Sequence, residues 1–315
     1  MLSFCFIITL FVGKSKISKN QISQVQDYKG IITIWHIDSF EGGIGSRRQF
    51  LLSVARKFEK DNNGVLVMVV NHTVDSANKL LSTNQKPDII SYGIGTNVSN
   101  AKQLKLNSKC YGGNLNDKTY AVCWCRGGYV LIENINIKEK QNKLIISNGK
   151  NNLTTLAYLE NNLNFEKVEV LSQDSAFEKF VLGKSKYLLG TQRDLHRLKN
   201  RTMQLNYTAL GGYNDLFQYI SILTSDMVKV AYANQFINFL MSAKIQKDLS
   251  KIGLMSCVGS VDYNDEIFNQ MQKIQDFKTL SAFLGKDMLE KVAQFALDGL
   301  KEDNESILKL KNMLI

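Results

Sequence analysis

The feature that most constrains the fold is a regular alternation of apolar runs and helical segments in the first third of the chain. Apolar runs rich in β-branched residues cover 31–37 and 64–70. Between them, apolar residues recur from 50 to 58 at the spacing of one helical face. A short helical segment and a third apolar run at 87–93 follow. This order is typical of a doubly wound α/β sheet, whose ligands bind beyond the carboxyl ends of the strands.

A glycine-rich loop at 38–46 joins the first strand to the first helix. Ser46 and Gln49 form a capping-box pattern that predicts the start of this helix. Gly43 and Gly45 lack the third glycine of a dinucleotide fingerprint, because Arg48 stands in its place, and no Walker lysine follows. We therefore exclude both nucleotide sites, although the helix N-terminus still offers N–H donors to a ligand.

The rest of the chain continues the α/β pattern and then becomes mostly helical from Asp226 onward. Two extended stretches flank Gly211 and Gly212. The other predicted elements are apolar segments at 119–125 and 127–134, strands at 167–171 and 185–191, and helices at 153–163, 173–183 and from 192.

Composition indicates a folded protein large enough for two cores. The 315 residues are 44% hydrophobic and 22% charged. Pro87 is the only proline, so any two lobes are joined by strands or short turns and not by a proline-rich linker. The net charge of +10 comes from lysines mixed with acids, which is typical of a solvated surface. We expect no nucleic-acid partner, and no helix-turn-helix module precedes residue 30.

The N-terminus carries an apolar run at 2–12 that is too short to span a bilayer and has the length of a signal-peptide core. Lys14, Lys16 and Lys19 follow this run, whereas an ordinary signal has its basic residues before it. We expect residues 1–28 to be an export segment of atypical form, either cleaved or kept as an anchor.

Neither cysteine nor histidine spacing indicates a metal site, a cofactor or a catalytic centre. The five cysteines are sparse and odd in number, and Cys123 and Cys125 form a C-x-C that suits neither zinc nor a redox pair. We expect structural thiols. His36, His72 and His196 have no metal-ligand spacing.

The ordered set of segments resembles extracellular solute-binding protein family 1, the broad group that contains maltose-binding protein. The similarity covers about residues 30–260, and no single motif is specific; the order is. The segments are 32–69 (first strand, ligand loop, first helix, second strand), 87–93 (third strand), 119–134 (first crossing), 175–195 (second-lobe helix and strand) and 236–256 (a helix ending in an isoleucine-glycine turn).

This resemblance implies a type 2 periplasmic-binding-protein fold. Each of two lobes would be a doubly wound, mostly parallel sheet, and a multi-strand hinge would join them. We place the crossings near 121–125, 211–217 and 257–262. The lobes would then be 29–121 plus 218–257, and 122–217 plus 258–315. The chain is short for the family, which argues against a long oligosaccharide ligand.

The resemblance also implies a function without catalysis. The protein would capture a small ligand, most simply a sugar, by hinge closure and deliver it to the permease of an ABC transporter. It would be an extracytoplasmic monomer at the cell surface or in the periplasm, associated with the membrane through the transporter or its N-terminal segment. Two alternatives stay open. One is a sensor or chemoreceptor partner, and the other is an enzyme of the same fold with Cys123 or Cys125 as nucleophile and Glu41 as base.

The expected ligand contacts lie in loops after strands and at the crossings. Aromatic faces stack on sugar rings, and carboxylate, amide and guanidinium groups bind hydroxyls. Arg47, Arg126 and Arg193 could instead neutralise an anionic ligand. The predicted ligand-binding residues are Ser39, Phe40, Glu41, Tyr92, Trp124, Gln192, Arg193 and Tyr213.

Overall fold

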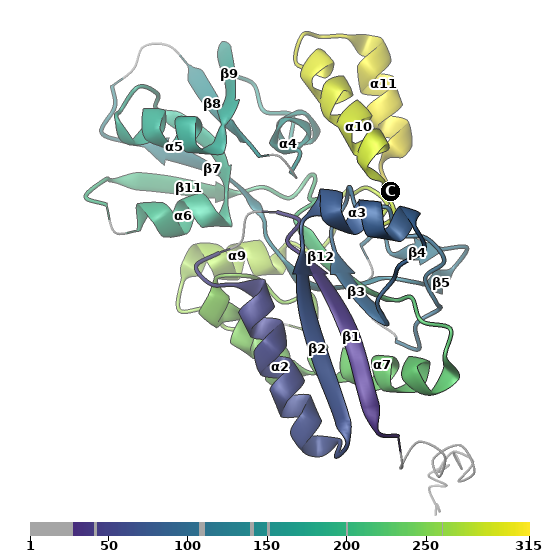
Figure 1. The fold of residues 1–315 in the computed structure, drawn as a ribbon. Helices are drawn as coiled ribbons and strands as arrows, with labels where there is room; N and C mark the ends of the chain where they lie inside the picture. The colour runs from purple at the N-terminus through teal and green to yellow at the C-terminus, as the bar shows by residue number, and fades with distance from the viewer. Residues whose placement is uncertain are drawn as a thin grey trace, which may run out of the picture.

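A computed structural model describes residues 28–40, 43–106, 111–138, 142–149, 152–199, 201–259 and 261–315. These residues form two α/β lobes, each built on a five-stranded sheet (Figure 1). The predicted α/β class with two lobes is therefore confirmed. The expected export segment at 1–28 lies, except for its last residue, outside the described residues.

The first sheet combines strands from distant parts of the chain. Its strands, in spatial order, are β2 (Val65–His72), β1 (Gly30–Ile37), β3 (Ile89–Tyr92), β12 (Phe217–Ile222) and β6 (Val122–Arg126). β1 pairs in parallel with β2 and β3, whereas β12 runs antiparallel to β3 and β6. The carboxyl ends of β1, β2 and β3 therefore meet at one edge of this sheet.

The second sheet repeats this mixture of directions. Its strands are β11 (Leu205–Ala209), β7 (Tyr129–Asn134), β10 (Tyr187–Thr191), β8 (Lys143–Asn148) and β9 (Lys167–Ser172). β8 is parallel to β9 and β10, and β7 is antiparallel to β10 and β11. In each sheet two of the four pairings are parallel and two are antiparallel. Four strands therefore run in one direction and only one, β12 or β7, runs against them, as the predicted mostly parallel sheets require. The sequence did not predict β8 at all. A hairpin of β4 (Asn114–Leu115) and β5 (Lys118–Thr119) lies beside the first sheet.

Helices cover the sheets and close one end of the molecule. The first lobe carries α2 (Arg47–Asp61), α3 (Val74–Ser82), α7 (Met227–Leu240), α8 (Ala243–Gln246) and the 3-10 helix η1 (Lys247–Ile252). The second carries α4 (Thr154–Glu160), α5 (Gln173–Val181), α6 (Gln192–Leu198) and α9 (Glu266–Lys273). A C-terminal hairpin of α10 (Lys286–Gly299) and α11 (Asn304–Met313) packs against α4 (Figure 1).

Helix α2 begins where the sequence predicts. Ser46 accepts a hydrogen bond from the Gln49 amide (3.3 Å), and this cap ends the glycine-rich loop. Phe50 and Phe58 are among the buried residues of its apolar face. Phe50 stacks on Trp124 of β6, with ring centroids 5.7 Å apart. The helix therefore closes the first-lobe core over the strand that leads into the hinge.

The chain passes between the sheets after β6, between β11 and β12, and again after Met255. Arg126 and Met255 pair as an antiparallel bridge, so the first and third passages lie side by side. The fully buried Arg126 guanidinium donates to the carbonyls of Met271 (2.9 Å), Gln272 (3.2 Å) and Ile274 (2.9 Å). A cation at the carboxyl end of α9 stabilises that helix end. Arg126 is thus a hinge residue and does not face a ligand.

The division of the chain at residues 121, 217 and 257 stays a prediction. β6, which follows residue 121, pairs within the first sheet.

Within the part of the chain that the structure describes, no helix combines the length and apolar character needed to cross a bilayer.

Candidate ligand-binding cleft

Two adjoining pockets of about 660 and 690 Å³ lie between the lobes. They share Asp38, Asn148, Gly149 and Asn152. Asp38 directly follows β1 of the first sheet, and the other three residues end or follow β8 of the second. The pockets therefore form one cleft where the carboxyl ends of strands from both sheets face each other, which is where open α/β sheets bind ligands.

Asp38 lies where the two pockets meet and is held by two donors. Its Oδ1 is 3.0 Å from His36 Nε2 and 3.0 Å from Arg47 Nε. Its side chain is 53% exposed, and its Oδ2 forms no hydrogen bond with the described residues. One carboxylate oxygen is thus fixed by the protein, while the other is open to a ligand.

A buried hydrogen-bond network sets the tautomer of His36. Ser91 Oγ accepts from Trp124 Nε1 (3.0 Å) and from Gln218 Nε2 (3.1 Å). Both lone pairs of this hydroxyl are then used, so its single proton points to His36 Nδ1, 3.1 Å away. Burial lowers the pKa of His36, which keeps the ring neutral. His36 therefore carries its proton on Nε2 and donates it to Asp38.

Asp38 remains charged at any physiological pH. Partial burial raises its pKa, but the hydrogen bond from His36 and the charge of Arg47 outweigh this effect and lower the pKa to about 2. Arg47 is itself fixed, because its Nη2 donates to the Phe40 carbonyl and its guanidinium lies 4.2 Å from the Phe40 ring centroid. The loop after β1 is therefore pre-organised around a carboxylate–guanidinium pair.

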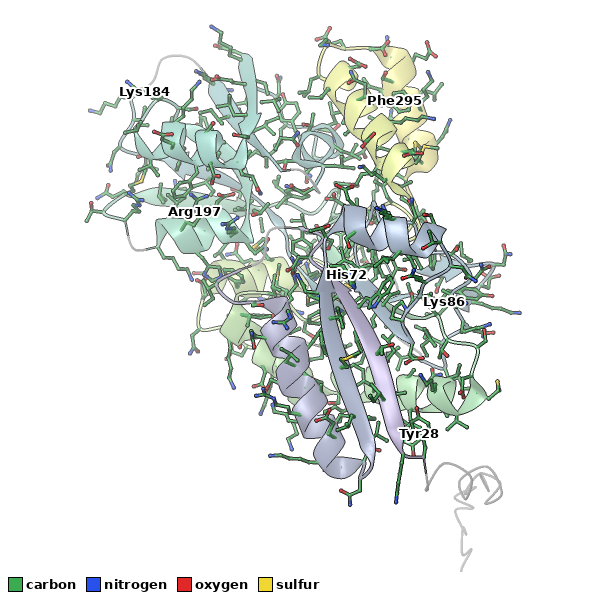
Figure 2. The ribbon with its side chains drawn as sticks, viewed as in Figure 1. Tyr28, His72, Lys86, Lys184, Arg197 and Phe295 are labelled. Carbon is green, nitrogen blue, oxygen red and sulfur yellow. The ribbon has the colours of Figure 1, made fainter. Side chains whose placement is uncertain are left out.

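The second pocket has a mixed wall that reaches the C-terminal hairpin. Leu289 and Ala293 of α10 supply apolar surface opposite the end of β2. His72, at that end near the centre of the molecule (Figure 2), packs on Trp35 with ring centroids 4.6 Å apart. Lys286 Nζ pairs with Asp75 Oδ1 at 2.8 Å and links α10 to α3. This pocket can therefore cover an apolar face of a ligand.

Two of the residues predicted from sequence line the cleft. Phe40 and Arg193 lie in the first pocket, on opposite lobes. Glu41 lies outside the described residues. The others are buried and line neither pocket; they are Ser39, Tyr92, Trp124, Gln192 and Tyr213.

These five side chains lie behind the cleft wall, where they hold the sheets and hinge. Tyr92 bonds to Ser221 Oγ (3.1 Å), and Ser39 Oγ donates to Gln218 Oε1 (2.9 Å). Gln192 Oε1 accepts from the Gly128 amide (3.0 Å) at the first passage. The Tyr213 ring stacks on Tyr129 at 6.4 Å, and Trp124 stacks on Phe50 as described above. Their position beside predicted loops suggested ligand contact, but the three aromatic rings pack in the core, and hydrogen bonds hold Ser39 and Gln192 behind the wall.

The three cysteines among the described residues lie in the core and not in the cleft. Cys123, Cys125 and Cys257 are buried free thiols, and burial raises the pKa of Cys123 and Cys125 well above the usual value. None of the three lines either pocket. The described ranges contain no cluster of three or more His, Cys, Asp or Glu side chains that could hold a metal ion.

Sequence reasoning missed Asp38, Asn148 and Asn152. Asp38 carries a signal that could have been used, because it is the first polar residue after a buried strand. Asn148 is the last residue of β8. Because the sequence did not predict this strand, it could not predict that Asn148 lies at the carboxyl edge of a sheet. Asn152 is fixed by a bond from its Nδ2 to Thr154 Oγ1 (2.9 Å).

Comparisons with known proteins find likeness in structure only. No protein-family model matches the chain, and no curated protein matches it. The GacH receptor of Streptomyces glaucescens, solved unliganded and with acarbose, is 14% identical with a TM-score of 0.62, over 89% of this chain and 95% of that one. Maltose-bound MalE3 of T. maritima is 11% identical with a TM-score of 0.59, over 90% and 97%.

An iron-binding protein shares the same architecture. Iron-bound HitA of Pseudomonas aeruginosa is 15% identical with a TM-score of 0.55, over 85% of this chain and 97% of that one. The predicted resemblance is thus confirmed at the level of the fold, across neighbours with different ligands. The chain has the two-lobed fold of type 2 periplasmic-binding proteins.

Proposed function

We propose that this protein is the solute-binding protein of an ABC transporter, which captures a small ligand between its lobes. The observation that carries the proposal is the cleft, which has strand ends of both sheets as its walls and a fixed carboxylate, Asp38, at its centre. Proteins of this fold close by rotation about the hinge. A ligand that touches both lobes binds the closed state better and shifts the population toward it.

A carbohydrate is the ligand class that fits this cleft best. A sugar hydroxyl both donates and accepts, so it suits a wall that mixes acceptors with donors. Asp38 offers a carboxylate oxygen, Asn148 and Asn152 offer amides, and Arg193 offers a guanidinium. Phe40 and Leu289 supply apolar surface for a ring face. Acarbose and maltose in two neighbours of the same fold support this choice.

The partners and location follow from the same proposal. The closed form would dock on an ABC permease on the outer side of the membrane, and the protein would act as a monomer. A protein that passes its ligand signal to a sensor would use the same cleft. Binding experiments therefore test the ligand class, and they do not distinguish transport from sensing.

The test is ligand binding by the purified chain and by Asp38→Asn. A panel of mono- and disaccharides is screened by thermal shift, because a ligand specific for the folded state raises the melting temperature. Calorimetry then gives the affinity of each hit. We expect Asp38→Asn to weaken binding at least tenfold, since the amide loses the charge that orders Arg47 and His36. Asp61→Asn, at the exposed end of α2, is the matched control and should bind normally. Carbohydrate binding that is equal in Asp38→Asn would remove Asp38 from the site, and no carbohydrate hit would remove the ligand class.

A further inference from the structure

We infer that the first pocket binds an oxyanion group of the ligand, such as a phosphate or a carboxylate. The inference rests on the proposed function and narrows its ligand class from neutral sugars to sugars that carry an acidic group. The second pocket, with the apolar wall of α10, would then cover the uncharged part of the ligand.

Two helix N-termini from opposite lobes meet at this pocket. α2 has 15 residues and enters it with Ser46 and Arg47, and α5 has 9 residues and enters it with Ser172, Gln173 and Asp174. The first amides of a helix have no intrahelical partner and carry the positive end of the helix dipole. An anion between two such ends is stabilised from both sides of the cleft.

The N-terminus of α5 is not satisfied by its own cap. Ser172 makes no side-chain hydrogen bond to the helix, and its Oγ donates to Ser175 Oγ instead (3.0 Å). Helix α6 in the same lobe shows the usual alternative, because Thr191 and Asp194 close a full capping box. The first-turn amides of α5 therefore remain available to a group in the pocket.

A buried guanidinium supplies the second, independent observation. Arg47 lines the pocket and is only 3% exposed. Its Nε and Nη2 are bonded to Asp38 and Phe40, but its Nη1 is buried and has no hydrogen-bond partner among the described residues. A buried donor without an acceptor costs free energy, and an oxyanion that enters the pocket would provide the acceptor after a small movement of this side chain.

The charges around the pocket favour an anion. Its lining carboxylates are Asp38 and Asp174. Asp38 is held by Arg47, and Asp174 Oδ1 lies 3.7 Å from Arg197 Nη1 on α6. Arg197 is on the second lobe (Figure 2), where Arg193 of the same helix adds a positive charge to the pocket wall. Each lining carboxylate thus has an arginine beside it, and the positive ends of the two helices add positive potential to the pocket.

The test compares neutral and acidic forms of the same sugars on the full chain. Calorimetry is run with hexoses, the corresponding hexose 6-phosphates, hexuronates and inorganic phosphate. We expect at least one phosphorylated or uronate form to bind ten or more times tighter than its neutral parent, with a dependence on salt. The phosphate and uronate arms separate the two kinds of oxyanion. Inorganic phosphate should compete with a phosphorylated hit.

Two variants and one control locate the effect. Arg193→Gln should reduce the preference for the acidic form at least tenfold, and Arg47→Lys should reduce it because lysine lacks the planar fork of donors. Arg56→Gln removes the same charge from the exposed face of α2 and should keep the preference. Because Arg47 is buried, each variant is first checked for folding by its unfolding midpoint. Arg193→Gln, on a half-buried site, keeps the test valid if Arg47→Lys does not fold.

The outcomes separate this inference from the proposed function. Neutral and acidic forms that bind equally, or a preference that survives both substitutions, overturns the oxyanion pocket while carbohydrate binding stands. Binding of inorganic phosphate without any sugar affinity supports the pocket and overturns the carbohydrate class. If no compound in either set binds, both are overturned.

Discussion

Asp215 is the residue at which the hinge and the cleft meet. Its fully buried carboxylate accepts from Tyr129 Oη at 2.6 Å and from the Leu153 amide at 2.9 Å. Tyr129 begins β7 after the first passage, Asp215 lies in the second passage, and Leu153 lines the second pocket. One side chain therefore fixes two hinge segments and the loop that leads into α4.

The titration of Asp215 should be visible in stability. Burial raises its pKa from 3.8 to about 6, although the two hydrogen bonds oppose this. The folded state thus holds the proton more tightly than the unfolded state. The stabilisation that Asp215 gives the folded state is therefore complete below pH 4, and it is lost as the pH rises through 6. We expect the free energy of unfolding to fall by about 1 kcal/mol between pH 5 and 8 relative to Asp215→Asn. Urea denaturation across this range measures it, and a constant difference between the two proteins would contradict the raised pKa.

Trp124 should matter for stability far more than for ligand contact. It is fully buried, stacks on Phe50 and donates to Ser91. Trp124→Ala should therefore cost about 3–5 kcal/mol through the cavity and the lost hydrogen bond. Trp35→Ala, at a half-buried ring of the same sheet, is the comparison and should cost less. Chemical denaturation gives both values, and similar small losses would show that Trp124 is not a core residue.

At this scale the sequence identified residue types better than their surroundings. Aromatic residues beside predicted loops looked like cleft residues, yet α2 covers Trp124 and β12 covers Tyr92, and both come from distant parts of the chain. Phe40 and Arg193 line the first pocket, and each lies within three residues of the end of a strand, β1 or β10. The same rule applied to Asp38 would have found the central carboxylate.

At the scale of elements, η1 ends in a conformation that only glycine adopts easily. Gly253 has φ of 65°, and its amide bonds to the Ser250 carbonyl (3.1 Å). A Cβ at this position would overlap the ring of His196 on α6. The end of η1 therefore fits against the second lobe without space for a side chain.

Gly253→Ala should be costly for two separable reasons. The left-handed backbone costs about 1 kcal/mol for alanine, and the overlap with His196 adds to it. In the background of His196→Ala the overlap with the ring disappears and only a 3.1 Å approach to the Ile44 amide nitrogen remains, so the cost of the alanine should fall toward about 1 kcal/mol. A double-mutant cycle by thermal or urea unfolding measures this coupling. Costs that simply add would mean that the two residues do not touch.

Elements with a strong local signal were predictable, and elements without one were not. The cap at Ser46 and the helical spacing after it located α2, and turn residues around Gly211 separated β11 from β12. β8 is only six residues long, with three apolar residues between lysine and polar residues. It lies inside the sheet because β9 and β10 pair with it on either side. The six residues of β8 alone carry no signal for these pairings.

At the scale of the molecule, the order of elements was sufficient to predict two α/β lobes. The one reversed strand of each sheet, β12 in the first and β7 in the second, was not predictable, because each of them follows a passage of the chain between the lobes. Three passages between the sheets would let the two lobes rotate against each other. This is the global motion that the proposed function requires.

Ligand binding should therefore make the particle more compact. With a carbohydrate or acidic-sugar hit at saturation, small-angle X-ray scattering should show a smaller radius of gyration than without ligand, because the closed state is selected. Asp38→Asn at the same ligand concentration should keep the larger radius. An unchanged radius on saturated wild-type protein would show that binding occurs without lobe closure.

The strand order of the first sheet also dictates when this protein can fold during synthesis. β12 lies between β3 and β6, but β6 ends at residue 126 and β12 begins at residue 217. While the ribosome makes the intervening second lobe, β6 has no partner on its inner side and the first sheet stays unfinished. The first lobe can close only after residue 222 has emerged, through contacts that are distant in sequence and slow to form. The first lobe thus stays incomplete until β12 has been made, a property set by topology alone.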